Sequence, residues 1–416
     1  MTVTLTAGRP GSPGRPSTSA AVVAPPPPVL RLAVFALALG GFGIGTTEFV
    51  AMGLLPDIAA GMDVSEPIAG HVISAYALGV VIGAPVIASL TARVSRRVLL
   101  MSLMVVFIVG NLASVLAPNY EALIGARFIA GLPHGAYFGV AALVAARMLG
   151  PARRAKAVAQ VMTGLTVATV VGVPAASWLG QALGWRSAFA LVVVIGLVTL
   201  AAIWAWLPEI GTDQVSSPLT ELGALKRPQV WLALAIGMVG FGGMFAVYTY
   251  VATTMTDVAG MSRGLIPLAL MVFGAGMVVG NTVGGRMADR SVVRSLYITI
   301  TALGVMLAGF VVAAHNPWSA LILLFGIAAS GAAMAPALQT RLMDVAADAQ
   351  TLAAALNHSA LNIANAAGAW IGGLVIAAGL GYTAPAAAGA VMAASGLVVL
   401  TIAVLLQRKE KKVRDE

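Results

Sequence analysis

The stretch GVVIGAPVIASLTARVSRR, residues 79–97, recurs in altered form as GMVVGNTVGGRMADRSVVR, residues 276–294. Each copy begins with Gly-x-x-x-Gly, and an arginine follows ten residues after the second glycine. The offset, 276 minus 79, is 197 residues, and it also relates Leu183-Gly184-Trp185 to Leu380-Gly381-Tyr382. We therefore interpret the chain as one unit written twice in the same orientation.

The composition assigns this unit to a membrane. Hydrophobic residues make up 59% of the chain, charged residues make up 9%, and the mean hydropathy is +0.95. A soluble domain carries about 25% charged residues. A helix needs about 20 apolar residues to cross a bilayer, and runs of that length predict twelve spans, at roughly 32–55, 68–90, 98–117, 122–146, 157–182, 187–207, 230–255, 265–287, 295–314, 318–340, 351–378 and 384–406.

Basic residues predict the orientation, because Lys and Arg concentrate in cytoplasmic loops. They gather on one side of the predicted spans, whereas the opposite loops hold only Arg186 and Arg263 and are acidic. We expect a multi-pass protein of the cytoplasmic (inner or plasma) membrane with both termini in the cytoplasm. The net charge of +9 then reflects the Lys and Arg of the cytoplasmic loops and tails. We expect no nucleic-acid partner, because the sequence predicts no soluble domain that could carry a basic face.

The predicted organisation is two six-helix bundles joined by a polar linker. Parallel six-helix repeats with a binding site near the middle of the membrane are a common transporter design. The expected segments are a disordered tail at 1–30, a first bundle at 31–207, a cytoplasmic linker at 208–228, a second bundle at 229–407 and a basic tail at 408–416.

Three motifs carry a family resemblance. GTTEFVAMGLLPDIA (45–59), RFIAGLPHG (127–135) and GGRMADR (284–290) resemble motifs of the major facilitator superfamily, in its twelve-helix drug:proton antiporter branch. The first of these is similar to the opening of chloramphenicol- and arabinose-type efflux permeases. The resemblance implies an all-α integral membrane fold, proton coupling at the second motif and gating at the third.

Two departures from the family pattern concern gating. Ala92 replaces the acid that the family places in the first copy of the gating loop, although Arg93 and Arg97 remain. The fifth span carries GVPAASWLG, with Gly172, Pro174 and Gly180, where antiporters of this family more often show a fuller Gly-Pro-Gly-Gly pattern. Gly172 and Pro174 still allow a bend and close helix contact. We expect gating residues in both copies and at this bend, namely Arg93, Arg97, Gly172, Pro174, Gly285, Asp289 and Arg290.

Glu48 lies inside the first apolar run, where a charged carboxylate costs several kcal/mol unless it is paired, hydrated or protonated. Arg127 lies at a similar depth, since the two residues are about seven and five positions from the outer ends, roughly 7–10 Å. We expect proton coupling at Glu48, Arg127 and His134, with a switchable Glu48–Arg127 interaction. The alternative is that Arg127 binds backbone carbonyls or headgroups and has a structural role alone, fixing the position of its helix.

The expected substrate wall combines polar and aromatic side chains from several spans. His358, Asn362 and Asn365 form a stripe at helical spacing on the eleventh span, although asparagines between membrane helices are also common packing residues. The remaining members of the predicted substrate site are Glu48, Tyr76, Tyr137, Phe245 and Tyr248. Asp57 and Asp257, at the outer ends of the first and seventh spans, are interpreted as solvated caps.

Several activities are excluded or disfavoured by the sequence. No lysine follows a glycine, which excludes a P-loop. The sequence also shows no metal-ligand spacing and no nucleophile–base pair. We therefore expect neither an enzyme nor a bound cofactor. The favoured function is a monomeric, proton-driven exporter of a small amphipathic compound, drug-like or phenicol-type. The alternatives are a sugar or nucleoside efflux permease, a uniporter or symporter, and, from another class, a membrane receptor or sensor.

Overall fold

The computed structural model describes residues 27–91, 94–150, 153–209, 226–346 and 350–415. In these ranges the chain forms helices and no strand, and twelve helical segments are long and apolar enough to cross a membrane. Each segment lies within a few residues of a predicted run. The all-α, twelve-span prediction is therefore confirmed.

The first half of the chain (residues 27–209) forms six spans, several of which are divided by short irregularities. Its helices are α1 (Pro27–Gly53), α2 (Leu55–Gly61), α3 (Glu66–Ala69), α4 (His71–Leu90), α5 (Arg96–Leu116), α6 (Tyr120–Gly131), α7 (His134–Leu149), α8 (Arg154–Val167), the π-helix η2 (Ala168–Gly172), α9 (Val173–Leu183) and α10 (Arg186–Trp206).

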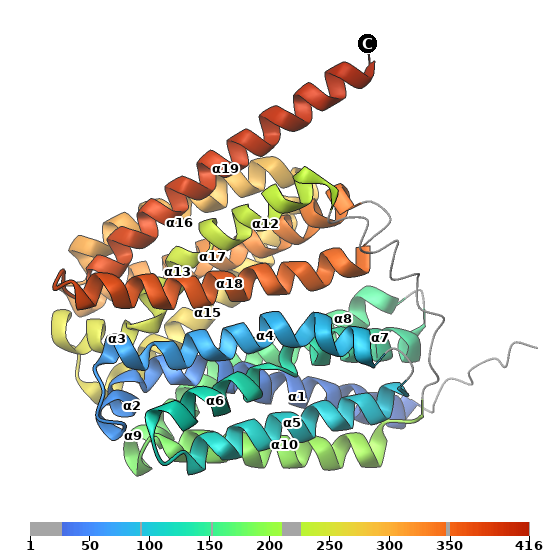
Figure 1. Cartoon of the computed structure of the whole chain (residues 1–416), viewed down its shortest axis with the longest axis horizontal. Helices are drawn as coiled ribbons and strands as arrows, with labels where there is room; N and C mark the ends of the chain where they lie inside the picture. The colour runs from blue at the N-terminus through green and yellow to red at the C-terminus, as the bar shows by residue number, and fades with distance from the viewer. Residues whose placement is uncertain (1–26, 92–93, 151–152, 210–225, 347–349, 416) are drawn as a thin grey trace, which may run out of the picture.

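The second half (residues 226–415) forms the other six spans. Its helices are α12 (Pro228–Gly240), α13 (Gly242–Thr249), α14 (Val251–Thr253), the π-helix η4 (Thr254–Val258), the 3-10 helix η5 (Arg263–Leu265), α15 (Ile266–Arg290), α16 (Val292–Ala313), α17 (Pro317–Ala346), α18 (Gln350–Ala377) and α19 (Ala384–Asp415). In Figure 1 this half lies above the first, and α19 continues past the rest of the bundle.

The internal repeat is visible in the packing of its glycines. A Cβ added to Gly83 on α4 would lie 2.0 Å from the carbonyl oxygen of Leu132, so the two backbones touch. A Cβ added to Gly280 on α15 would lie 2.1 Å from the carbonyl oxygen of Ala329 on α17. Both the glycines and their partners are 197 residues apart. The Gly-x-x-x-Gly pattern of α4 and α15 is thus a helix-packing motif at equivalent positions of the two halves.

Two loop glycines repeat in the same way. Gly184 and Gly381 have φ angles of +88° and +80°, a left-handed conformation that favours glycine. Each follows a leucine and precedes an aromatic residue at the start of the next turn. This agreement extends the repeat to the end of the fifth span in each half.

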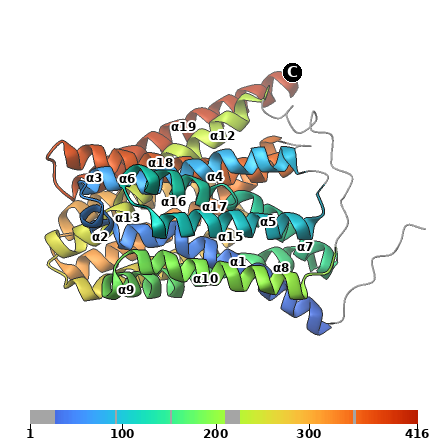
Figure 2. The same ribbon diagram turned by 60° about the horizontal axis from the view of Figure 1, so that its bottom comes forward.

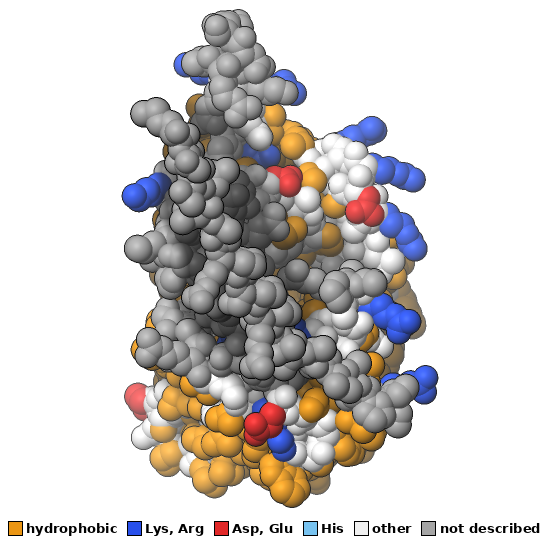
Figure 3. Space-filling view, turned by 90° about the vertical axis from the view of Figure 1, so that its right-hand side faces the viewer, with side chains coloured by type: hydrophobic (Ala, Val, Ile, Leu, Met, Phe, Trp, Pro, Cys, Tyr) orange, Lys and Arg blue, Asp and Glu red, His pale blue; other side chains and the backbone are white. Residues whose placement is uncertain are grey.

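The two ends of the bundle differ in charge. The end that holds the loops α4–α5, α7–α8, α15–α16 and α17–α18, called here the basic end, shows more Lys and Arg than Asp and Glu in Figure 3. The opposite end, called here the acidic end, holds α2 and α3 and carries Asp57, Asp63, Glu66, Glu121 and Asp257. Figures 1 and 2 both place α2 and α3 at one end of the bundle and the junction of α7 with α8 towards the other.

The halves meet along two helix pairs. The α4 helix packs against α18, and η2 and α9 pack against α15. At the second contact, a Cβ on Gly274 would lie 2.3 Å from the carbonyl oxygen of Thr169 in η2. The π-helical turn ends at Val173–Pro174, and proline has no N–H to continue the usual hydrogen-bond register. The segment where a bend is expected, at Gly172 and Pro174, thus contains a π-helical turn at the interface.

Candidate functional site

The centre of the first half holds a fully buried arginine. Arg127 on α6 donates two hydrogen bonds to Thr47 on α1, one to its side-chain oxygen and one to its carbonyl oxygen, each 2.9 Å long. Thr47 in turn donates to Oδ1 of Asn111 on α5, and the Asn111 amide donates to the carbonyl oxygen of Phe107 at 2.8 Å. Arg127 and Thr47 therefore tie α1, α5 and α6 together.

Aromatic rings enclose the same guanidinium group. Its central carbon lies 4.5 Å from the ring centroid of Tyr76 and 5.0 Å from that of Phe189. A cation between aromatic faces is stabilised by the ring quadrupoles, most strongly where water is excluded. The Tyr76 hydroxyl also lies 3.1 Å from Nδ1 of His134, so a continuous polar contact leads from Arg127 to His134.

Glu48 lies one residue beyond Thr47 on α1 and is 6% exposed. In the described part of the chain its carboxyl group forms no hydrogen bond, and no ion pair joins it to Arg127. It is nevertheless within electrostatic range of Arg127, of Tyr76 and of Tyr248 in the second half. The structure thus places a carboxyl group without a direct partner at the interface between the halves.

Aromatic residues of both halves pack next to this carboxyl. The ring of Phe49 lies 6.4 Å from that of Phe245 and 5.9 Å from that of Tyr248. Tyr248 stacks on Phe273 of α15 at 3.7 Å with the planes 5° apart. Two predicted wall residues, Phe245 and Tyr248, therefore pack against Phe49, the residue that follows Glu48 on α1.

The predicted polar stripe lies on α18. His358 stacks on Phe138 of α7 at 6.5 Å, which is a contact between the halves. Asn362 and Asn365 are 5% and 1% exposed; Oδ1 of Asn362 and both polar side-chain atoms of Asn365 are buried without a hydrogen-bond partner. Buried unsatisfied amides are uncommon and call for an explanation.

Tyr137 is the predicted wall residue that the structure places elsewhere. Its hydroxyl donates to the carbonyl oxygen of Leu37 at 3.0 Å, and the ring packs against Gly40. Both partners belong to α1 of the same half. In this conformation Tyr137 is part of the core of the first half, away from the polar stripe on α18.

The predicted gating residues are spread over the basic end and η2. Arg97 donates to the carbonyl oxygen of Trp204 at the end of α10 in its own half. Asp289 is exposed and forms no ion pair within the described ranges, and Gly285 has open space beside it. Arg290, like Asp289, is exposed at the end of α15. Arg93 and Ala92 lie outside the described residues.

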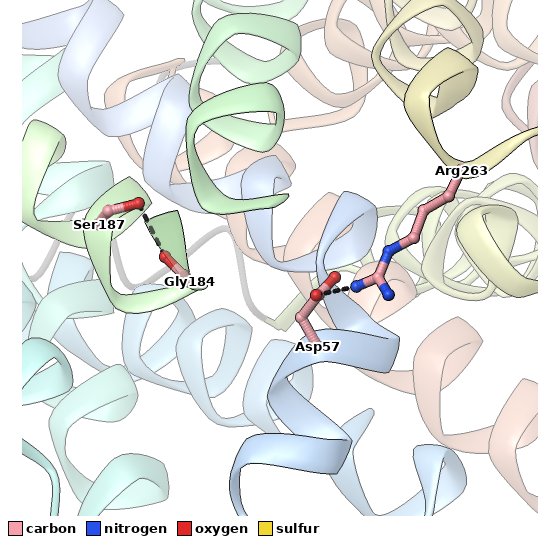
Figure 4. A network of polar contacts seen from close by, with 4 residues as sticks. All are labelled: Asp57, Gly184, Ser187 and Arg263. Carbon is pink, nitrogen blue, oxygen red and sulfur yellow. Dashed lines mark hydrogen bonds and ion pairs between the residues drawn. The ribbon is translucent and has the colours of Figure 1, made fainter. Parts of the chain in front are cut away.

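The acidic end is where the halves are joined by polar contacts. Asp57 on α2 forms an ion pair with Arg263 on η5, as Figure 4 shows. Thr253 donates to Glu66 on α3, and the two pairs line one small pocket of about 320 Å³. Burial raises the pKa of the Asp57 carboxyl, although the charge of Arg263 opposes this. The interpretation of Asp57 as a solvated cap is wrong, because it faces a cation of the other half.

Several residues of the site were not predicted from the sequence. Thr47, Asn111 and Phe189 hold Arg127, and Phe138 joins His134 to His358 through ring contacts. Asn111 had a usable signal, since it is an amide within an otherwise apolar span. Phe138 and Phe189 had none, because phenylalanine is ordinary in such spans.

Comparison with known proteins agrees with this architecture. A family model described as Major Facilitator Superfamily matches residues 37–294 and 250–416. The chain is 40% identical over 380 residues to the inner membrane transport protein YdhP of Escherichia coli (strain K12), covering 91% of this chain and 97% of that protein. It is 34% identical over 361 residues to the chloramphenicol resistance protein of Streptomyces lividans, covering 85% of this chain and 90% of that protein.

Two further matches extend the comparison. The probable sugar efflux transporter of Pasteurella multocida (strain Pm70) is 30% identical over 373 residues, which is 89% of this chain and 91% of that protein. Among solved structures, a bacterial homologue of the human lysosomal transporter Spinster, in an inward-facing and unoccupied conformation, superposes with a TM-score of 0.70 at 17% identity. The alignment covers 91% of this chain and 96% of that one, and it supports the fold alone.

Proposed function

This chain belongs to the major facilitator superfamily and is a secondary transporter, not an enzyme, and we propose that it exports a small amphipathic, drug-like compound in exchange for protons. We place it in the cytoplasmic (inner) membrane with its basic end and both termini in the cytoplasm, and we expect a functional monomer. The printed name of the YdhP relative and the distribution of Lys and Arg support this location.

The observation that carries the proposal is the state of Glu48. A buried carboxylate without a hydrogen bond or ion pair is strongly disfavoured, so the neutral, proton-bearing form fits the closed acidic end of this conformation. Hydration or a new partner in another conformation would favour release of that proton. Glu48 therefore has the properties required of a proton carrier.

Arg127 supplies a partner for the other state. Two of its donors are used by Thr47, but Nε is buried and has no acceptor. A small movement of α1 relative to α6 could offer this donor to Glu48, whose position follows Thr47 directly. In the conformation observed, Arg127 instead binds a backbone carbonyl and holds α1. His134, linked through Tyr76, is the neighbouring titratable group and would serve as a relay.

The lining supports an amphipathic substrate. Phe245 and Tyr248 offer apolar faces, and Asn362 and Asn365 offer buried amides whose hydrogen bonds are unused. A drug-like molecule with an aryl group and hydrogen-bonding groups, such as a phenicol, fits both features. The relative named as a chloramphenicol resistance protein supports this choice. The relative named as a probable sugar efflux transporter supports sugar export as the second candidate.

We propose that gating alternates between the ends. The Asp57–Arg263 and Glu66–Thr253 contacts join the halves at the acidic end, which is closed in the conformation described here. When it opens, the basic end must close. Asp289, with Gly285 and Arg290 beside it, would then pair with basic residues of the first half, for which Arg93 and Arg97 are the candidates.

Substrate-induced proton release in weakly buffered detergent tests the proposal, with chloramphenicol as the probe. Wild-type protein should release protons on addition of the compound, and Glu48→Gln, which mimics the protonated side chain, should not. The matched control is Glu121→Gln, which removes an exposed carboxylate at the acidic end and should release protons normally.

Each other result selects an alternative. Release from Glu48→Gln equal to wild type would mean that Glu48 is structural and that the proton travels by another route. Release induced by arabinose but not by chloramphenicol would favour a sugar exporter. Substrate flux in liposomes that is independent of an imposed pH gradient would indicate a uniporter.

A further inference from the structure

A groove lies on the outer face of the second half, at the basic end and away from the central site. It runs between the start of α16 and the last turns of α19 and has a volume of about 590 Å³. Its lining combines apolar and polar side chains, namely Ser291, Val293, Arg294, Tyr297, Ile298, Val404, Gln407 and Arg408.

The surface next to this groove faces the bilayer. Along α16, Ile298 and Val305 are exposed large apolar residues, and along α19, Ile402 and Leu405 are exposed as well. Side chains of this kind are exposed on a spanning helix because lipid tails cover them. The groove therefore opens where the headgroup layer meets the hydrocarbon, with an apolar strip leading from it towards the bilayer centre.

The charges around the groove are mainly positive. Arg294 and Arg408 are exposed on its two walls. Behind it Arg341 on α17 is 4% exposed and donates to Gln407 at 3.2 Å and to Gln229 at 3.3 Å, both neutral amides. Its Nε has no acceptor. The side chains that bind Arg341 are neutral, and the carboxylate of Asp344 offsets its charge only from a distance, without an ion pair in the described ranges.

Two further features suit an anion. The groove begins at the N-terminus of α16, a helix of 22 residues whose end carries partial positive charge. The acid nearest in sequence to Arg341 is Asp344, which is exposed at the end of α17 and does not line the groove. The Ser291 hydroxyl, which accepts from the backbone N–H of Arg294, can still donate a hydrogen bond at the mouth, whereas the Tyr297 hydroxyl donates to Thr401.

We propose that this groove binds the headgroup of an anionic phospholipid, such as phosphatidylglycerol, with the acyl chains along Ile298 and Ile402. Charge complementarity selects the headgroup, and the apolar strip selects a lipid over a soluble phosphate. Binding would join α16 to α19 and so stabilise the outer layer of the second half. The inference does not depend on which compound the protein transports.

Lipid binding to the purified full-length protein tests this directly. Titration of phosphatidylglycerol into phosphatidylcholine nanodiscs, followed by native mass spectrometry, should show a retained anionic lipid. Arg294→Gln and Arg408→Gln should each weaken retention about fivefold, and the double variant about 30-fold, because each basic residue near an anionic surface contributes similarly. Both side chains are exposed, so the variants should fold.

The control double variant is Arg153→Gln with Lys226→Gln, which removes two exposed charges from the same end but outside the groove. It should retain the lipid within about twofold of wild type. Lysine at both positions, Arg294→Lys with Arg408→Lys, should restore most of the binding. Equal loss of lipid by the control double variant would mean that the basic end attracts anionic lipid in general and that the groove is not a site. Full lipid retention by Arg294→Gln with Arg408→Gln would also overturn the proposal. Displacement of the lipid by inorganic phosphate at millimolar concentration would assign the groove to a free anion instead.

Discussion

Replacing Gly280 by alanine tests the close contact on which the repeat depends. The new Cβ would lie 2.1 Å from the carbonyl oxygen of Ala329 and 2.7 Å from its carbonyl carbon. An ordinary carbon–oxygen contact is about 3.3 Å or longer, so α15 and α17 would have to separate by about 1 Å. The obstacle is backbone, which cannot rotate away. We expect a loss of about 1–3 kcal/mol of stability, seen as a lower midpoint of thermal unfolding in detergent.

The control lies on the same helix. Gly285 has nothing within 4 Å of its added Cβ, so Gly285→Ala should raise the midpoint, because alanine exceeds glycine in a helix by about 0.5–1 kcal/mol. Gly83→Ala should behave like Gly280→Ala, since its Cβ would meet the carbonyl oxygen of Leu132 at 2.0 Å. Equal shifts for Gly280→Ala and Gly285→Ala would refute the argument from packing.

Three more outcomes are expected. Because burial raises the pKa of Asp57 in the closed end, lowering the pH from neutral towards that pKa should favour the closed acidic end; spin-label distances across the pair should shorten, and Asp57→Asn should weaken this dependence, leaving the part due to Glu66 of the same pocket. Arg127→Lys should lower the unfolding midpoint, with a loss of about 1–3 kcal/mol, because an ammonium group cannot reproduce the paired hydrogen bonds to Thr47; an unchanged midpoint would contradict the arrangement. Asn365→Leu should raise the midpoint, since two unsatisfied polar atoms are removed, while weakening transport of a phenicol; improved transport would exclude Asn365 from the substrate wall.

Span number and spacing could be predicted from the sequence because both follow from the length of apolar runs. The repeat was also predictable, since close backbone contacts restrict those positions to glycine and leave a pattern of fixed spacing. Gly83 and Gly280 are examples, and the structure gives them equivalent partners. Burial of Glu48 and Arg127 followed from their positions inside predicted spans.

The partner of each buried group could not be predicted in the same way. Thr47 and Glu48 are neighbours, but successive side chains on a helix point about 100° apart, and Arg127 binds the first of them. Which one it meets depends on the rotation of α1 about its axis, which the apolar pattern of an almost wholly apolar helix does not specify. The Asp57–Arg263 pair could not be predicted for another reason, because its partners lie 206 positions apart and belong to different halves.

The two copies of the unit have diverged at the centre while keeping their packing glycines. At the offset of 197 residues, Glu48 corresponds to Phe245 and Tyr76 corresponds to Phe273, so the second half is aromatic where the first is polar. Phe245 and Phe273 both belong to the wall that contacts Phe49 and Tyr248. A proton carrier in one half and an aromatic wall in the other would separate the proton step from most of the substrate contact. Coupling must then cross the interface at Glu48, because this carboxyl is within electrostatic range of Arg127 on one side and of Tyr248 on the other.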